Sequence, residues 1–458
     1  MWIKLSLALG GMAVLFGLSI RPVPYQYVTL QPNGGWKEAS PNTEGARILL
    51  GSSSFILPLV RAINWVGDPF KQWLVPLAND MTVDALKQKA IALIGHDDFG
   101  DLADWDAFHR LLQVGEEHCH LLGRLALKEM AFKMLAYNLK IQKLLKDHPE
   151  IKDETIDRPV LLMAFTRTGA TFLYQVLADI YREELKPTYS YEIFGGPIAI
   201  GGQDRRMQEA EKALNDLAVV NPPMKLLHEW IAPDEPEDEP GWYQYTLMGV
   251  VIPFSFPSEW HHAKIYQPES QQLNFRLWET LNKIRQWQAG KKLRFLMKAP
   301  EHLFGYPQIA QAYPNATFVS VSRDEESWYP SSLIMTHLFR QMFVHPRVED
   351  TIAFADRLLC GQRQALQVAH NLPNNTILPV QFGKYLFTQT MDVVEQIAIH
   401  ADLPWDDDAK TRAQQVIQKR LSWKKEKAFY KLEDFGLSKE LVAERVATIC
   451  DKLPAVDL

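Results

Sequence analysis

The segment Thr166–Thr171, which reads TRTGAT, combines residue types that bind an anionic group such as a phosphate or sulfate. It follows an apolar run and precedes a pattern typical of a helix. Backbone N–H groups at a helix N-terminus attract anions, and Gly169 lets the chain approach them closely. Arg167 adds a positive charge, and Thr168 and Thr171 add hydroxyl groups. The first glycine and the lysine of the ordinary nucleotide-triphosphatase loop are missing, so a plain strand-to-helix turn is the alternative interpretation.

Two further motifs follow predicted strands. Lys298 and His302 come after one of them, where they are placed for anion contact and proton transfer. Arg323 follows another, and Ser331 lies eight residues later. A guanidinium and a hydroxyl in this arrangement can grip one phosphate together. The alternatives are a core histidine at His302 and a surface ion pair between Arg323 and Asp324.

Together these motifs resemble those of the sulfotransferases that use 3′-phosphoadenosine-5′-phosphosulfate (PAPS). In that family, a P-[RK]-[ST]-G-[ST]-T loop holds the 5′-phosphosulfate, and a strand-end Arg with a Ser eight residues later holds the 3′-phosphate. The segment Lys298–His302 resembles the K-S-P-x-H of a mostly bacterial branch. Other stretches of that branch resemble residues 94–100, 148–151 and 312–318. The resemblance covers roughly residues 80–440.

The resemblance implies transfer of a sulfuryl group from PAPS to an acceptor hydroxyl or amine by in-line displacement, without a metal ion. Arg167 would stabilise the leaving phosphate, and Lys298 would assist it. Ala170, Thr166 and Ala299 replace the usual Ser or Thr, Pro and Ser, so one hydroxyl group is lost from the loop. A non-catalytic, membrane-attached member with a degenerate loop is therefore one alternative, and a P-loop nucleotide kinase is another. The implied donor-binding residues are Arg167, Thr168, Gly169, Ala170, Thr171, Phe172, Arg323 and Ser331.

A general base is expected to take the acceptor's proton, and the sequence offers three candidates. They are Glu192, His302 and the acidic cluster Glu237–Glu239, which is otherwise a solvated loop. Glu192 is the first choice, because Tyr191–Phe194 resembles a W-E-L/F segment whose glutamate serves as the base in related members. The aromatic stretch Trp242–Ile265 is expected to line the acceptor cleft. The acceptor class stays open between a small molecule, a lipid and a carbohydrate.

The spacing of apolar residues predicts an α/β fold with a helical region before the core. Residues Val83–Leu145 repeat at helical spacing and predict three or four helices. After Pro159, short apolar runs alternate with helical patterns, which predicts a P-loop-like parallel sheet flanked by helices. The motifs would then meet at the carboxyl edge of the sheet. The expected strands are Val160–Phe165, Leu293–Met297, Thr317–Val321 and Thr376–Val380.

The composition is that of a globular protein of 458 residues, 47% of them hydrophobic, with a net charge of −6. This balance argues against a nucleic-acid partner, which usually requires a basic surplus. It also means that a polyanionic donor would have to be bound by cations gathered locally. The three cysteines allow at most one disulfide, which suits a reducing compartment.

The N-terminal run Leu5–Ile20 contains no charged residue. As a helix it would rise about 24 Å, and Met1–Ile3 lengthen it if Lys4 reaches toward water. We expect a single-pass membrane anchor whose orientation the flanking charges leave undetermined. A cleaved signal peptide and a buried helix are the alternatives. The expected organisation is an anchor at 1–24, a linker with short packed segments at 25–80, a helical region at 81–155 and a sulfotransferase core at 156–458.

Overall fold

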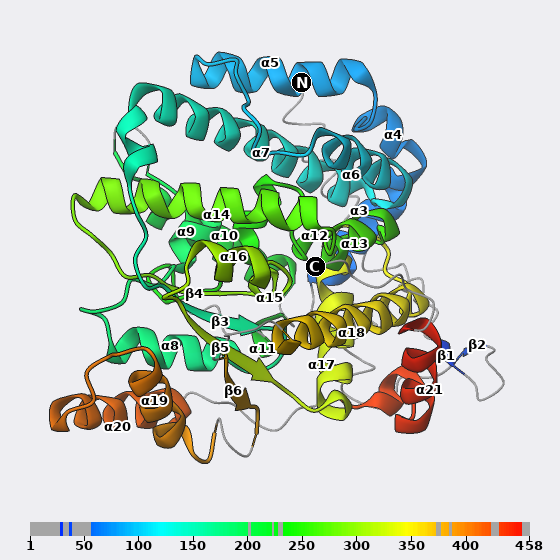
Figure 1. Cartoon of the computed structure of the whole chain (residues 1–458). Helices are drawn as coiled ribbons and strands as arrows, with labels where there is room; N and C mark the ends of the chain where they lie inside the picture. Colours follow the sequence, from blue (N-terminus) through cyan, green and yellow to red (C-terminus); the bar gives the residue numbers. More distant parts are fainter. Residues whose placement is uncertain are drawn as a thin grey trace.

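A four-stranded parallel sheet in the order β4-β3-β5-β6 lies at the centre of the molecule (Figure 1). The computed structural model describes residues 28–30, 36–38, 56–199, 203–221, 224–227, 232–371, 377–383, 387–422 and 430–450. Each strand begins and ends within a few residues of its predicted position, so the predicted parallel sheet is confirmed. The strands are β3 (Val160–Ala164), β4 (Leu296–Ala299), β5 (Thr317–Ser322) and β6 (Ile377–Gln381).

The two faces of the sheet are buried in separate apolar cores, because successive side chains of a strand point to opposite faces. Val160 and Leu162 belong to one core and Leu161 and Met163 to the other. The first core is covered by α8 (Ala170–Ile180), α19 (Thr390–His400) and α20 (Asp407–Ser422). The second is covered by α14 (Pro268–Ala289), α15 (Glu301–Phe304), α16 (Tyr306–Ala312), α17 (Glu325–Gln341) and α18 (Val348–Asn371). Figure 1 shows the sheet between these two layers.

Three helices form an outer layer beyond α14, as the helical spacing predicted (Figure 1). Asn79 caps the first of them by accepting a hydrogen bond from the Thr82 N–H at 2.8 Å, and Gly95 ends it in a left-handed conformation with φ +69°. The three are α5 (Asp80–Ile94), α6 (Trp105–His118) and α7 (Leu121–Asp147). They are preceded by β1 (Val28–Leu30), β2 (Trp36–Glu38), α3 (Ile56–Gly67), η1 (Asp68–Phe70) and α4 (Lys71–Leu74).

A long insertion between α8 and α14 covers the free edge of β4. Lys186 pairs with Phe295 just before β4, and the backbone N–H of Lys298 donates to a carboxylate oxygen of Glu239 at 2.8 Å. The insertion therefore protects an edge that would otherwise expose unpaired backbone groups. Its elements are α9 (Ser190–Phe194), α10 (Arg206–Val220), α11 (Met224–Leu227), η3 (Glu239–Tyr245), α12 (Val251–Ser255) and α13 (Glu259–Lys264). The remaining short elements are η2 (Pro149–Asp153) and η4 (Leu432–Phe435).

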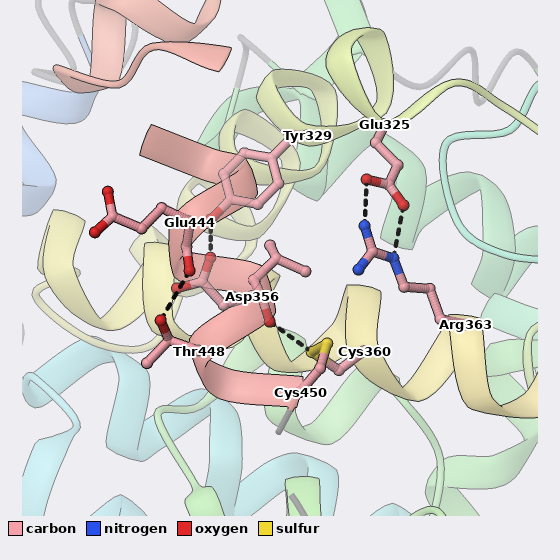
Figure 2. The surroundings of a disulfide bond; sticks show 9 residues. Glu325, Tyr329, Asp356, Cys360, Arg363, Glu444, Thr448 and Cys450 are labelled. Carbon is pink, nitrogen blue, oxygen red and sulfur yellow. Dashed lines mark hydrogen bonds and ion pairs between the residues drawn. A yellow bond between two sulfur atoms is a disulfide. The ribbon is translucent and has the colours of Figure 1, made fainter. Parts of the chain in front are cut away.

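The C-terminal helix α21 (Lys439–Cys450) is joined to α18 by a disulfide between Cys360 and Cys450 (Figure 2). An ion pair between Arg445 and Asp356 at 2.8 Å lies beside it. Cys119 is buried with a free thiol. Disulfides persist mainly in oxidising compartments, so this bond does not favour the reducing compartment that the cysteine count suggested.

The expected membrane anchor at residues 1–24 lies outside the described residues. Within the described ranges, no helix combines the length and the apolar character that crossing a bilayer requires.

Candidate active site

The loop between β3 and α8 is held in a shape that exposes backbone N–H groups. Gly169 precedes α8 with φ +78°, and Arg167 also adopts a left-handed conformation with φ +65°. The Thr168 hydroxyl donates to the Phe165 carbonyl at 2.8 Å, and the Trp328 indole N–H donates to the Thr166 carbonyl at 2.7 Å. Since the first N–H groups of a helix lack intrahelical partners from a preceding turn, the start of α8 can offer such groups to an anion.

The side chains of Arg167 and Arg323 both lie against α17, where each donates a hydrogen bond to a serine. The Arg167 Nε donates to Ser331 Oγ at 2.9 Å, and the Arg323 Nε donates to Ser327 Oγ at 2.9 Å. A second Arg323 nitrogen donates to the Arg167 carbonyl at 2.9 Å. Ser331 therefore contacts Arg167 here, whereas the sequence paired it with Arg323. The two serines lie one turn apart on the same face of α17, so each arginine finds its own hydroxyl.

Neither of these guanidiniums forms an ion pair with a carboxylate in the part of the chain that the structure describes. Both are half-buried, and the Arg323 guanidinium lies 4.2 Å from the centre of the Phe382 ring. Burial lowers the pKa of Arg323, and the charge of Arg167 acts in the same direction. Two partly desolvated cations without a protein counter-ion favour binding of an anion between them.

Tyr430 completes this cluster from a distant part of the chain. Its hydroxyl donates to Ser331 Oγ at 2.9 Å. Burial would raise the pKa of Tyr430, but the positive charge of Arg167 and hydrogen bonds to Ser331 and Arg167 outweigh it and hold the pKa below its ordinary value. No sequence motif pointed to Tyr430, because it lies 99 residues from Ser331.

Lys298 links the loop to the acidic segment of the insertion. Its ammonium nitrogen lies 3.1 Å from Thr171 Oγ1 and 2.6 Å from a carboxylate oxygen of Asp238. Asp238 keeps 15% of its side chain exposed. Its neighbour Glu237 is buried, and burial together with the Asp238 charge raises the Glu237 pKa well above its ordinary value. An ammonium and a carboxylate thus stand together at the carboxyl end of β4.

A model of the sulfotransferase family matches residues 159–407, more than half of the chain. The chain belongs to the sulfotransferase family. The match contains the loop, Lys298, Arg323 and Ser331, so the resemblance predicted from these motifs is confirmed at the level of the family. No curated protein sequence matches the chain significantly.

Two crystal structures of mycobacterial sulfotransferases share the fold. Sulfotransferase STF1 from Mycobacterium tuberculosis H37Rv is 21% identical, with a TM-score of 0.61 over 80% of this chain and 98% of that chain. Sulfotransferase STF9 from Mycobacterium avium is 17% identical, with a TM-score of 0.63 over 82% of this chain and 97% of that chain. At these identities the likeness concerns the fold of the sulfotransferase and not its acceptor.

Ala170 and Phe172 of this sulfotransferase face the core beneath the loop. The Ala170 side chain is buried in the core on the α8 face of the sheet. The Phe172 ring packs against Phe387 with 5.1 Å between ring centres. Ala170 can therefore offer the donor only its backbone, whereas Phe172 stays partly exposed.

Glu192, the first choice for the base, forms a buried ion pair with Arg285. The Arg285 Nε and a second guanidinium nitrogen lie 2.9 and 3.1 Å from its two carboxylate oxygens. The Tyr189 N–H also donates to this carboxylate at 3.0 Å, which caps α9. Glu192 lines a polar cavity of about 670 Å³ whose wall includes Leu293 and Arg294, which precede β4. This placement favours a structural role for Glu192, because it is ion-paired with Arg285 and lies toward the opposite end of β4 from Lys298.

His302, the second candidate, is buried in the core with 1% of its surface exposed. Its Nε2 lies 3.0 Å from the Tyr243 hydroxyl, and burial and the Lys298 charge lower the pKa of His302 to about 3. It is therefore a core histidine, the alternative interpretation. Of the three candidates, the acidic cluster is the one linked to the loop between β3 and α8. Asp238 pairs with Lys298, whose ammonium also bonds Thr171 at the start of α8.

The aromatic stretch Trp242–Ile265 does not form the open acceptor cleft that we expected. Trp242 is fully buried, and the two adjacent histidines of the stretch are buried as well. Burial lowers the pKa of His261 to about 4 and that of His262 to about 3. Aromatic residues suit a core and a cleft equally, so composition alone could not separate the two. Other buried members of this stretch are Tyr243, Tyr245, Phe254 and Phe256.

Proposed function

We propose that the protein transfers a sulfuryl group from PAPS to an acceptor hydroxyl or amine. The observation that carries the proposal is the pair of half-buried arginines, Arg167 and Arg323, at the carboxyl ends of adjacent strands and without carboxylate partners among the described residues. A donor with two anionic ends matches two such cations beside a helix N-terminus. Membership of the sulfotransferase family supports the same reading.

The residues present fit this donor. Arg167, Lys298 and the backbone from Thr168 to Phe172 would hold the phosphosulfate end. Arg323 and Ser327 would hold the 3′-phosphate, with Tyr430 beside Arg323 and Ser331 one turn of α17 beyond Ser327. When bound, PAPS supplies the sulfuryl group, and the bond between its sulfur and the bridging oxygen is the one that breaks.

In this proposal Asp238 is the general base. It is partly exposed and lies next to Lys298, so an acceptor hydroxyl at the loop comes within its reach. Asp238 takes the hydroxyl proton as the acceptor oxygen bonds to sulfur. Arg167 and Lys298 then stabilise the negative charge that develops on the departing phosphate. Burial and the Asp238 charge raise the pKa of the neighbouring Glu237 well above its ordinary value, so Glu237 adds little negative charge beside the base.

Calorimetry with 3′,5′-adenosine bisphosphate, the product of the donor, tests the site. We expect the unmodified chain to bind it and Arg323→Ala to bind it roughly 10- to 100-fold more weakly, because a charge-assisted hydrogen bond is worth about 1.5–3 kcal/mol. Arg363→Ala is the matched control, since Arg363 lies at the surface and pairs with Glu325, the first residue of α17. Binding of ATP with magnesium, and not of the bisphosphate, would establish the nucleotide kinase alternative instead.

A chain that binds the bisphosphate but transfers no sulfate would be the non-catalytic alternative. That outcome has a physical basis in Ala170 at the start of α8. Its methyl group stands where the loop motif of the PAPS-dependent sulfotransferases usually has the hydroxyl of a Ser or Thr. Transfer is measured with radiolabelled PAPS and a panel of lipid, carbohydrate and phenolic acceptors. Sulfation of any member excludes the non-catalytic alternative.

The uncharged run Leu5–Ile20 is proposed as a single-pass membrane anchor, with its orientation open. Resistance of the full chain to alkaline extraction from membranes supports the anchor, and complete release contradicts it.

A further inference from the structure

The short helices before the outer layer carry a concentration of exposed apolar side chains. Nine large apolar residues are exposed among those that the structure describes, and five of them lie within one ten-residue stretch. Their exposed fractions run from 48% to 83%. We call these five the α3–α4 patch, and they are Trp65, Val66, Phe70, Trp73 and Leu74.

Leu125 on α7 extends the patch. It is 49% exposed and follows Leu121 by about one helical turn. Leu121 contacts Gly67 so closely that a side chain at Gly67 would meet it at 2.2 Å. Leu125 therefore lies on the helix against which α3 packs. Exposed apolar residues elsewhere in the described chain are isolated, namely Leu93, Met207 and Ile399.

Polar contacts hold the segment against the molecule. Asn64 and Asp68 accept hydrogen bonds from the N–H groups of Leu122 and Leu121 at 3.0 and 2.8 Å, which satisfies the start of α7. The Lys71 ammonium donates to the Cys119 carbonyl at 2.7 Å. The usual distribution is thus partly inverted between residues 64 and 74, because Asn64, Asp68 and Lys71 face the protein while the five patch residues and Gln72 face outward.

An inverted segment of this kind fits an apolar or interfacial environment better than water. Two of its five residues are tryptophans, which combine a large apolar ring with an N–H group and gather at the surface of lipid bilayers. The uncharged run Leu5–Ile20 ends 45 residues before Trp65, so the anchor and the patch can meet the same bilayer. We propose that the α3–α4 patch inserts into the surface of a phospholipid bilayer.

The inference is independent of the sulfotransferase site, because no patch residue belongs to it. A single cysteine placed at the patch in the full chain tests it. Cys119 is buried and the other two cysteines are bonded, so a thiol-reactive fluorophore would label only the new position. The variants are Trp73→Cys at the patch and Ile399→Cys on α19 as the matched exposed control.

Vesicles of phosphatidylcholine and phosphatidylglycerol are then added. We expect the emission of the label at position 73 to shift to the blue, to rise several-fold and to be quenched by nitroxide-labelled lipids. The label at position 399 should not respond. Phe70→Asp introduced beside the label at 73 should abolish most of the response, because a charge at the patch opposes insertion. Ile399→Asp in the same background should leave the response unchanged.

Three results would overturn the proposal. In the first, the chain floats with vesicles while the label at 73 stays unresponsive, which assigns membrane binding to the N-terminal run alone. In the second, the label is already shielded without lipid at all protein concentrations, which indicates that another segment of the chain covers the patch. In the third, shielding appears only as protein concentration rises, which identifies a second copy as the partner.

Discussion

At the scale of single residues, exposure and position distinguish the two acidic side chains that were considered for catalysis. Glu192 and Asp238 are both carboxylates near β4, but they have different partners. Glu192 is enclosed by Arg285 and a backbone N–H, whereas Asp238 contacts Lys298 and stays partly open to solvent. Because Asp238 is partly exposed beside the loop and Glu192 is enclosed toward the other end of β4, we propose Asp238 as the base and a structural role for Glu192.

Substitution of each carboxylate separates the two roles. We expect Asp238→Asn to lower kcat by roughly 10²- to 10⁴-fold, because general base catalysis contributes that much. The affinity for 3′,5′-adenosine bisphosphate should change little. Glu192→Gln should instead lower the free energy of unfolding by about 3–5 kcal/mol, since it leaves Arg285 buried without its partner.

Asp234→Asn, in the exposed part of the same acidic run, is the control and should keep full activity. Steady-state kinetics, calorimetry and denaturant titration measure the three effects. Loss of turnover in a well-folded Glu192→Gln variant, with Asp238→Asn fully active, would contradict the assignment.

The sequence identified the cations of the site but not their partners. Arg167, Lys298 and Arg323 stand at strand ends, and each was found from its local motif. The contacts that assign roles join distant segments: Arg285 lies 93 residues from Glu192, and Tyr430 lies 99 residues from Ser331. Local patterns carry no information about such pairs.

At the scale of elements, the strands were predictable because each is a short apolar run between turns. Buried parallel strands are covered on both faces and so lack the alternation of polar residues. The edge strand β6 contains Pro379, which an edge tolerates because one side of the strand needs no hydrogen bonds. The insertion across β4 was not predictable, because it is made of short helices held by individual polar contacts.

The disulfide between α18 and α21 makes the C-terminal helix part of the core. It closes a separation of 90 residues, for which loop-closure entropy predicts a stabilisation of about 4–5 kcal/mol. We expect Cys450→Ser to lower the free energy of unfolding by this amount under oxidising conditions. A reductant should lower the stability of the unmodified chain by a similar amount and leave the variant unchanged. Equal stability of the two proteins without reductant would show that the bond does not contribute.

At the scale of the whole molecule, the acidic chain brings three cations, Arg167, Lys298 and Arg323, to one edge of the sheet. The net charge of −6 predicted that donor-binding cations would be gathered locally. Arg167 and Arg323 are the pair that lack carboxylate partners there, and Lys298 joins them through Thr171. The α3–α4 patch is a second region that differs from the rest of the described surface, because its large apolar side chains are exposed. Composition therefore described the bulk of the molecule, while the two functional regions that we propose both differ from that average.

Buried histidines give the molecule a predictable sensitivity to acid. The folded pKa values are about 4 for His120 and His261 and about 3 for His262 and His302, in each case chiefly because burial disfavours the charged ring. The unfolded chain binds protons near pH 6.5, so it holds more protons than the folded state between these values. The stability from each histidine is present above pH 6.5 and is lost as pH falls toward 3–4.

His262→Gln should remove one group that binds a proton in the unfolded chain but not in the folded one. Glutamine can still bond the Tyr266 hydroxyl, which lies 3.1 Å from His262 Nε2, so the fold should be kept. Between pH 6 and pH 4, the free energy of unfolding should then fall less steeply than in the unmodified chain, by about 1.4 kcal/mol per pH unit. Denaturant midpoints measured across this range provide the comparison. The same substitution at His109, which is exposed on α6, should leave the slope unchanged. Parallel pH profiles for the unmodified chain and His262→Gln would mean that His262 titrates alike in the folded and unfolded states.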